Sequence, residues 1–248
     1  MKSIVTVYIT NYNYGSFLER SIQSVLNQSY KKIFLIIIDD NSKDNSKKIL
    51  EKYKNFNNVK IFINKKNKGL IKCANFAIKK SIGKFILRLD ADDYLSNNAI
   101  KLMVNKIKNK KNTIMVFPNF YNVNEKSIIT SRYSYRHKLK YNLLDKPAHG
   151  ACSLINIKFL KKIRGYKEVF DRQDGHYLWY SILCRKKNIS HINKFLFYYR
   201  MHQNNLSKQK KKLLLARIKI INFFLKKKIF NKELNYQKKL AENKLKLI

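Results

Sequence analysis

The feature that most constrains the fold of this chain is an alternation of short apolar runs and helical segments in its first 95 residues. The runs are rich in β-branched residues, whereas the segments between them repeat apolar residues at helical spacing. The predicted strands are 3–9, 33–38, 59–63 and 85–89. The predicted helices between them are 17–26, about 44–53 and 71–80. This alternation predicts a doubly wound α/β sheet, which gathers ligands at the carboxyl ends of its strands.

The rest of the chain carries fewer regular signals. A strand is expected at 114–117, a tyrosine-rich basic loop at 131–146 and a helix at 176–184. A last helix is expected over 208–228, where apolar residues are broken by basic ones. At 248 residues the chain is long enough for one α/β domain with a short appendage, and too short for two full domains.

The charge is strongly unbalanced, since 54 Lys and Arg face 15 Asp and Glu and leave a net charge of +39. Such a charge attracts phosphate groups and anionic lipid headgroups. The lysines accompany an excess of Asn and Ile, however, and a biased genomic base composition alone produces that mixture. A hydrophobic content of 45% excludes a disordered chain.

The three cysteines lie far apart and form no paired motif, so neither a disulfide framework nor a zinc site is expected. The N-terminal apolar stretch is too short for a signal peptide, and no window approaches the roughly 18 apolar residues of a membrane span. We therefore expect a cytoplasmic protein.

Three carboxylates, Asp90, Asp92 and Asp93, follow the apolar strand predicted at 85–89. Carboxylates this close repel one another unless a cation or a network of donors compensates their charge. Mg²⁺ or Mn²⁺ binds one or two carboxylates together with phosphate oxygens, so the cluster predicts a metal site for a bound nucleotide. Taken alone, the motif also fits an acidic turn in solvent.

A second acidic pair, Asp39 and Asp40, ends the strand predicted at 33–38. A carboxylate in that place can accept the N–H of a uracil or a ribose hydroxyl. The alternative is a helix N-cap, where Asp is favoured because it accepts backbone N–H groups. For Asp44 the N-cap is the preferred interpretation.

The order of four motifs narrows these possibilities. At strand–helix spacing the sequence reads ITNYNYGSFLERSIQSVLNQSY, IIIDDNSKDNS, NKGLIKCANFAI and LRLDADD. This series resembles the family 2 glycosyltransferases of the GT-A fold over roughly residues 1–200. The resemblance implies an inverting enzyme, a mixed and mainly parallel doubly wound sheet flanked by helices, and a nucleotide-sugar pocket in the first half.

The resemblance also assigns roles by position. Thr10 and Tyr12 would hold and stack the base, and Asp40 would pair with it. Asp90 would lie near the ribose, and Asp92 would bind Mn²⁺ or Mg²⁺ with Asp93 as a supporting ligand. The full set assigned to the nucleotide sugar is Thr10, Tyr12, Asn13, Asp40, Asn67, Gly69, Lys72, Asn75, Asp90, Asp92 and Arg200.

Two of these positions have a simpler structural interpretation. In that interpretation Tyr12 does no more than pack its loop, and Gly69 does no more than provide a turn with positive φ.

The second half resembles the acceptor side of the same family. The stretch HGACSLINIKFLKKIRGYKEVFDRQDGHYLWYSI matches one that usually ends in a Glu–Asp pair opening a helix, and here that pair reads Gln173–Asp174. Asp174 is the predicted general base, which takes the proton of the acceptor hydroxyl. Asp171 is the rival, and a helix cap is the structural alternative for both.

Other residues of this half are assigned to the acceptor and to the phosphates. His149, Gly150 and Ala151 would line the acceptor opening, together with Gln173, whose lack of charge puts in doubt the contact usually made by Glu.

The ending YYRMHQNNLSK resembles a Tyr-Arg-x-His motif of the family. It places Arg200 at the diphosphate and His202 in the metal shell. A single His is as often an ordinary packed residue.

The expected organisation is a glycosyltransferase domain over 1–207, with its nucleotide-binding part at about 1–95 and its acceptor part at about 96–207. A basic amphipathic helical tail would follow over 208–248. Such a tail fits peripheral contact with the anionic inner face of the cytoplasmic membrane, which suits a lipid-linked saccharide acceptor. Packing on the domain or on another subunit is the alternative.

Two other classes of protein share some of these sequence features. A sugar nucleotidyltransferase would need a glycine-rich loop after the first strand, and TNYNYGSF lacks one. A basic protein that binds nucleic acid or membrane without catalysis would explain the charge, but its acids would not gather at strand ends, where they repel phosphate. We therefore expect a nucleotide-sugar donor, with a lean to UDP, no nucleic acid, and a role in bacterial surface polysaccharide or lipopolysaccharide assembly.

Overall fold

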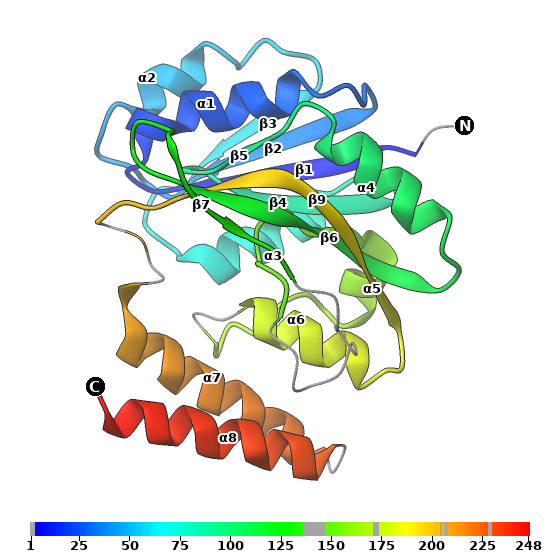
Figure 1. The fold of residues 1–248 in the computed structure, drawn as a ribbon. Coiled ribbons are helices and arrows are strands. Elements are labelled where there is room, and N and C mark those ends of the chain that lie inside the picture. Colours follow the sequence, from blue (N-terminus) through cyan, green and yellow to red (C-terminus); the bar gives the residue numbers. More distant parts are fainter. Residues whose placement is uncertain (1–2, 136–146, 171–173, 204, 206–207, 228–229) are drawn as a thin grey trace.

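The computed structural model describes residues 3–135, 147–170, 174–203, 205, 208–227 and 230–248. Its centre is one mixed sheet, with helices α1, α2 and α4 above it and α3, α5 and α6 below it in the view of Figure 1. The strand order is β3-β2-β1-β4-β8-β6-β9-β5, with β7 paired to β6. This is the α/β sheet that the sequence predicts.

The first half of the chain forms the parallel part of this sheet. Its strands are β1 (Val5–Asn11), β2 (Ile33–Asp39), β3 (Val59–Ile63) and β4 (Phe85–Asp90), and they pair with one another in parallel. The helices between them are α1 (Gly15–Leu26), α2 (Ser46–Glu51) and α3 (Leu70–Lys80). All seven predicted elements are confirmed, with ends that differ by a few residues at most.

The strand register brings the polar strand ends together. Thr10 of β1 pairs with Asp90 of β4 on one side and with Ile38 of β2 on the other, and Asn11 pairs with Asp39. The acidic pair after β2 and the acidic triplet after β4 therefore lie at the same edge of the sheet, on either side of the loop that follows β1.

The second half adds the antiparallel and longest strands. Its elements are β5 (Tyr94–Leu95), α4 (Ala99–Lys108), β6 (Thr113–Val123), β7 (Ile129–Tyr133), β8 (Leu154–Asn156), α5 (Ile157–Lys162), α6 (Asp174–Leu183) and β9 (Asn188–Arg200). Strand β8 is antiparallel to β4 and β6, whereas β6 and β9 run parallel.

The sequence predicted only part of this half. The strand expected at 114–117 is the middle of β6, and the helix expected at 176–184 is α6. The loop expected at 131–146 begins inside β7, and residues 136–146 lie outside the described part of the chain. The long β9 was not predicted.

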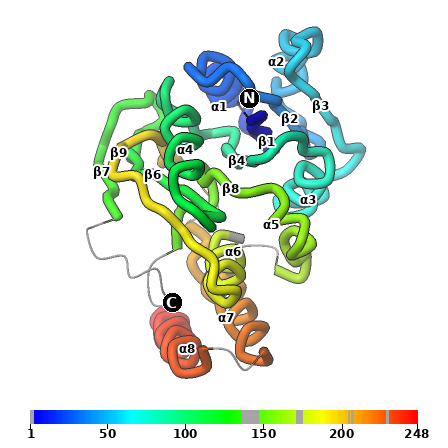
Figure 2. Tube along the Cα trace, turned by 90° about the vertical axis from the view of Figure 1, so that its right-hand side faces the viewer, coloured from blue at the N-terminus to red at the C-terminus, as the bar shows by residue number. Residues whose placement is uncertain are grey.

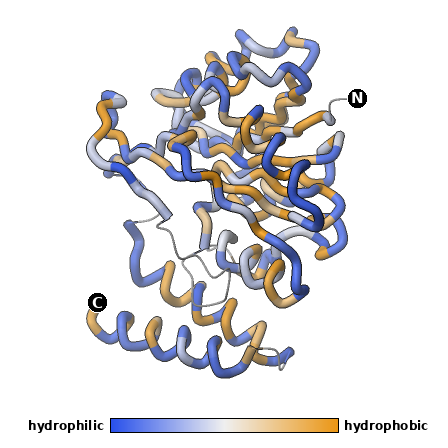
Figure 3. Tube along the Cα trace, turned by 45° about the vertical axis from the view of Figure 1, so that its right-hand side comes forward, coloured by the Kyte–Doolittle hydropathy of each residue, from blue (hydrophilic) through white to orange (hydrophobic). Residues whose placement is uncertain are grey.

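The core lies between the sheet and its helices, where the strands of the first half are buried on both faces. Val7 and Ile9 of β1, Leu35 of β2 and Leu87 of β4 have no exposed surface. Full burial of such a side chain contributes about 1.5–3 kcal/mol. Figure 3 shows this pattern, with apolar residues following the strands and hydrophilic ones the outer turns.

Two C-terminal helices form a separate layer beyond α6. These are α7 (Lys210–Leu225), which is the helix predicted over 208–228, and α8 (Asn231–Lys246), which was not predicted. Phe224 of α7 packs on Tyr180 of α6 with ring centres 5.7 Å apart, and α8 packs on α7 from outside (Figures 1 and 2). Within the described residues, no helix combines the length and the apolar character needed to cross a membrane.

Candidate functional site

The turn after β4 gathers three acidic side chains. Asp90 ends the strand, Asp92 and Asp93 follow it, and the Asp93 amide donates to the Asp90 carbonyl oxygen at 3.1 Å. One carboxylate oxygen of each residue lies within 4.8 Å of the other two. The three acids that the sequence singled out therefore face one small volume.

Each carboxylate has a different partner. Arg88 holds Asp90 in a two-pronged ion pair, with Nε 2.6 Å from Oδ1 and Nη2 2.8 Å from Oδ2. Asp92 Oδ2 lies 2.8 Å from His202 Nε2, and Asp93 Oδ1 accepts the Arg200 backbone N–H at 2.8 Å. Asp93 Oδ2 is buried and has no hydrogen-bond partner among the residues that the structure describes.

The electrostatics of this turn point to a missing positive charge. Burial raises the pKa of Asp92, and the nearby Asp90 raises it further. Burial and both neighbouring carboxylates raise the pKa of Asp93 well above its ordinary value. Burial and the same acids also raise the pKa of Tyr14, whose ring lies 5.4 Å from that of His202. Burial is the largest cause for all three groups, and the neighbouring negative charges add to it.

A hard divalent cation fits this arrangement. A bound cation would satisfy the unpartnered Asp93 oxygen and offset the repulsion among the three carboxylates, and the ligand atoms are mainly carboxylate oxygens, which suit Mg²⁺ and Mn²⁺. Asp92 and His202, both predicted as ligands, are already in contact.

Arg200, the last residue of β9, binds the backbone of the acidic turn. Its Nε donates to the Asp92 carbonyl oxygen at 2.8 Å, and its Nη1 lies 2.9, 2.7 and 2.9 Å from Asn124 O, Glu125 O and Ser127 Oγ. The residue is 1% exposed, with its guanidinium over the ring of Phe17. Its side chain therefore joins the acidic turn to the β6–β7 turn, and the predicted contact with a diphosphate stays a prediction.

Asp40, just after β2, organises the loop before α3. Its Oδ1 accepts from Asn64 Nδ2 and from the Lys68 amide, and its Oδ2 accepts from the Gly69 amide, all at 2.8 Å. Gly69 has a φ of +85°, so the turn interpretation is confirmed for it. The exposed Asn67 and Lys72 stand on either side of this turn.

The loops after β1 and β2 are tied to each other. Asn13 Oδ1 accepts the Lys43 amide at 2.7 Å, and the Asn13 amide donates to Ser42 Oγ at 2.9 Å. Between them Tyr12 is 45% exposed at the open edge of the sheet, beside the half-buried Thr10. The site thus offers an exposed aromatic ring next to the buried Asp40 carboxylate.

Asp44 supports the start of α2 as expected, but it stands one residue before the N-cap, which is Asn45. Its carboxylate accepts the Ser46 amide, where α2 begins, at 3.0 Å and the Gly15 amide, where α1 begins, at 2.8 Å. These hydrogen bonds lower its pKa. Its carboxylate therefore stabilises the first turns of α1 and α2.

The predicted acceptor residues lie on the other side of the acidic turn. The Cys152 amide donates to the Arg88 carbonyl oxygen at 2.8 Å, which brings the segment containing Gly150 and the buried Ala151 against β4. The ring of His149 lies 4.6 Å from that of Tyr199 and 5.2 Å from that of Phe197.

The start of α6 packs against the same segment. A Cβ placed on Gly175 would lie 3.3 Å from the Ala148 carbonyl oxygen and 3.7 Å from Gly150 Cα. Asp174 is the first residue of α6, so its backbone stands beside the acceptor segment. The side chain of Asp174, together with Gln173 and the rival Asp171, lies outside the described residues.

Two features depart from what the sequence suggested. The Asn75 side chain makes two hydrogen bonds to the Tyr166 backbone, in which Nδ2 donates to the carbonyl oxygen and Oδ1 accepts the amide N–H, each at 2.8 Å. Its role at the nucleotide therefore stays a prediction. Arg88 was not predicted as part of the site. It precedes Asp90 by two residues on a strand, and residues two apart share one face of a strand, so the sequence did carry a signal for their contact.

Comparison with known proteins agrees with this geometry. The chain is 29% identical over 225 residues to the UDP-Glc:alpha-D-GlcNAc-diphosphoundecaprenol beta-1,3-glucosyltransferase WfgD of Escherichia coli, which covers 90% of this chain and 87% of that protein.

Among solved structures it is similar to S. aureus TarS 1-349 in complex with UDP-GlcNAc, with a TM-score of 0.66, 17% identity and 88% of this chain covered. It is also similar to the mannosyltransferase PcManGT from Pyrobaculum calidifontis in complex with GDP-Man and Mn²⁺, with a TM-score of 0.68, 11% identity and 91% of this chain covered. The chain spans 65% of each of these two, and at such identities they show the fold alone.

The family model described as glycosyl transferase family 2 matches residues 6–164, which is more than half of the chain. This match sets aside the nucleotidyltransferase and the non-catalytic binding protein that the sequence left open. Its span includes both acidic strand ends and the acceptor segment. The chain belongs to glycosyl transferase family 2 and is a glycosyltransferase with a mixed α/β fold.

Proposed function

We propose that this protein is an inverting glycosyltransferase that moves a sugar from a UDP-sugar to a hydroxyl group of a saccharide acceptor. The observation that carries the proposal is the crowded acidic turn after β4, where Asp93 Oδ2 is buried without a hydrogen-bond partner among the described residues. It stands at the edge of the sheet where Tyr12 is exposed and where the acceptor segment begins.

On the donor side, Tyr12 would stack on the base, and the Asp40 carboxylate would accept a hydrogen bond from it. The Asp40 carboxylate accepts three hydrogen bonds from the protein, two on Oδ1 and one on Oδ2. The carboxylate also lies beside the Cys73 thiol, whose pKa is raised by burial and by the Asp40 charge. Its place directly after β2, next to the loop that carries the exposed Tyr12, supports pairing with the imide N–H of a uracil and a preference for UDP.

A divalent cation would be held by Asp92, with Asp93 as a supporting ligand and His202 beside it. When bound, such a cation offsets the charge that grows on the diphosphate leaving group. The role of Arg88 and Arg200 is then to hold the carboxylates in place, because both make several hydrogen bonds to the turn itself.

On the acceptor side, Asp174 would act as the general base. In an inverting transfer the acceptor oxygen attacks the anomeric carbon from the face opposite the leaving diphosphate, while a carboxylate takes the hydroxyl proton. The place of Asp174 at the start of α6, against the segment that contains Gly150, supports this role. Asp171 remains the alternative base.

The acceptor that we propose is a lipid-linked saccharide. The name of the Escherichia coli relative includes a diphosphoundecaprenol-linked GlcNAc acceptor and a UDP-Glc donor. We infer a similar place for this chain, in bacterial surface polysaccharide or lipopolysaccharide assembly at the inner face of the cytoplasmic membrane.

The test is the release of nucleoside diphosphate or monophosphate from UDP-, GDP-, dTDP- and CMP-linked sugars, with Mn²⁺ or with EDTA. We expect Mn²⁺-dependent release from a UDP-sugar by the wild type and a loss of at least about a hundredfold in Asp174→Asn. The control is Glu168→Gln, which changes an exposed acid of the same segment and is expected to keep full activity. Equal activity of Asp174→Asn and Glu168→Gln would remove Asp174 from the mechanism.

A further inference from the structure

Helix α8 is the outermost element of the fold, and only one of its faces is covered. Leu234, Gln237 and Ala241 are buried against α7. Beside this buried face, one position before Gln237 and Ala241, Tyr236 is 57% and Leu240 37% exposed, and Leu247, just past the helix end, is 86% exposed. Spacings of four and eleven residues place these three apolar side chains in one stripe along the helix.

Lysines border this apolar stripe. Lys232, Lys239 and Lys246 follow one another at intervals of seven along one flank, and Lys244 lies on the other flank. All four are exposed. A helix with an apolar stripe, lysine flanks and low overall hydrophobicity is typical of helices that lie in the headgroup region of a bilayer.

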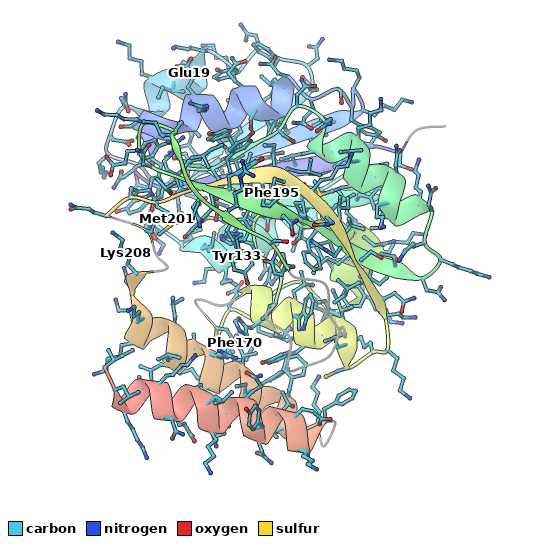
Figure 4. All side chains as sticks on the ribbon, viewed as in Figure 1. Glu19, Tyr133, Phe170, Phe195, Met201 and Lys208 are labelled. Carbon is cyan, nitrogen blue, oxygen red and sulfur yellow. The ribbon has the colours of Figure 1, made fainter. Side chains whose placement is uncertain are left out.

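The stripe ends on the side of the molecule that carries the acidic turn. In Figure 1 the C-terminus of α8 lies at the left, as do the ends of β9 and of β1. Figure 4 shows Met201, which follows Arg200, and Lys208, which precedes α7, on that same side. The most exposed apolar residues of the tail, Leu247 and Ile248, therefore lie on the side of the catalytic edge.

We propose that the outer face of α8 docks on an anionic lipid bilayer, with Tyr236, Leu240 and Leu247 inserted between headgroups and the flanking lysines on their phosphates. The charge argues for this occupant, because lysines outnumber acids on the face and the whole chain carries +39. Its purpose rests on the proposed function, since docking would bring the catalytic edge to a lipid-linked acceptor. A second copy of the chain or a soluble polyanion are the competing occupants.

The experiment is co-sedimentation of the full chain with vesicles of phosphatidylcholine, either alone or with roughly 30% phosphatidylglycerol. We expect binding to the anionic vesicles only. The basic variant, Lys232→Gln with Lys239→Gln and Lys246→Gln, should bind at least about tenfold more weakly, because each lysine near the surface adds a favourable charge interaction. The apolar variant, Tyr236→Gln with Leu240→Gln and Leu247→Gln, should also bind at least about tenfold more weakly, through lost burial.

The matched control removes three lysines elsewhere, through Lys47→Gln, Lys48→Gln and Lys101→Gln on α2 and α4. It should bind as the wild type does. Equal losses in the control and the basic variant would overturn the proposal, because net charge alone would then drive binding. So would unchanged binding of the apolar variant, or a dimer that forms without lipid and is lost in the apolar variant.

Thermal unfolding and the release of nucleoside diphosphate from UDP-sugars, both measured without vesicles, keep this test separate from the proposed function. The α8 variants should match the wild type in both, since the changed side chains are exposed and α7 is the element on which α8 packs. Vesicle binding that maps to α8 in a chain inactive on every donor would refute the enzyme proposal alone.

Discussion

Arg200 decides between two accounts of the site, and replacing it by Met separates them. In the structure its side chain serves the protein, with hydrogen bonds from Nε to Asp92 O and from Nη1 to Asn124 O, Glu125 O and Ser127 Oγ. Met fills a similar volume without any donor. We therefore expect Arg200→Met to loosen the acidic turn and lower the stability of the fold before any substrate is present.

The size of the loss follows from the donors. Nε carries one hydrogen and Nη1 carries two, so at most three full hydrogen bonds disappear. A hydrogen bond to a charged group contributes about 1.5–3 kcal/mol, and removing one buried partner of such a set costs about 3–5 kcal/mol in total. At roughly 2 °C per kcal/mol for a chain of this length, the melting temperature should fall by about 6–10 °C.

The assay is thermal unfolding by circular dichroism in the absence of metal and nucleotide. Arg132→Met is the control, because Arg132 is exposed on β7 and its loss should change stability by less than about 0.5 kcal/mol. A melting temperature within about 2 °C of the wild type, combined with lost sugar transfer, would refute the reasoning and favour direct contact between Arg200 and the diphosphate.

Three further predictions concern the metal, the donor loop and the backbone. Mn²⁺ at about a hundred times its dissociation constant should add roughly 2.7 kcal/mol to the stability of the wild type, seen as a rise of about 5 °C in differential scanning fluorimetry that Asp92→Asn abolishes. Asp40→Asn turns one acceptor into a donor, so it should lose the bond to the Gly69 amide, cost about 1.5–3 kcal/mol in urea unfolding and weaken UDP binding measured by calorimetry. Gly83→Ala should leave little folded protein in expression and melting tests, because φ there is +81° and the new Cβ would stand 2.4 Å from the Ile4 carbonyl oxygen.

The parallel half of the fold was predictable because its signals are local. Each of its strands is an apolar run closed by a polar cluster, and a sheet of parallel strands must bring those clusters to one edge. Asp40 and the three acids after β4 could therefore be placed near one another before any coordinates were known. The helix α4 carries equally clear apolar spacing and was overlooked.

The second half was less predictable because its structure depends on distant partners. Strand β9 pairs in parallel with β6, and its register shifts twice around Asn119, which removes the regular alternation that marks a strand. Helix α8 buries only a narrow stripe that includes Gln237, so its sequence looks polar throughout. The side-chain bonds of Arg200 go mostly to backbone carbonyl oxygens, for which the sequence has no signal.

The account stands on the claim that the acidic turn is the catalytic centre. The most direct test is transfer of a labelled sugar from its UDP-sugar to a lipid-linked acceptor, measured with Mn²⁺ and with EDTA for the wild type, Asp92→Asn and the control Glu125→Gln, whose acid is exposed. We predict transfer only with Mn²⁺, a loss of at least about a hundredfold in Asp92→Asn, and full activity in the control. Transfer by Asp92→Asn at the wild-type rate, with the same response to EDTA, would contradict the account.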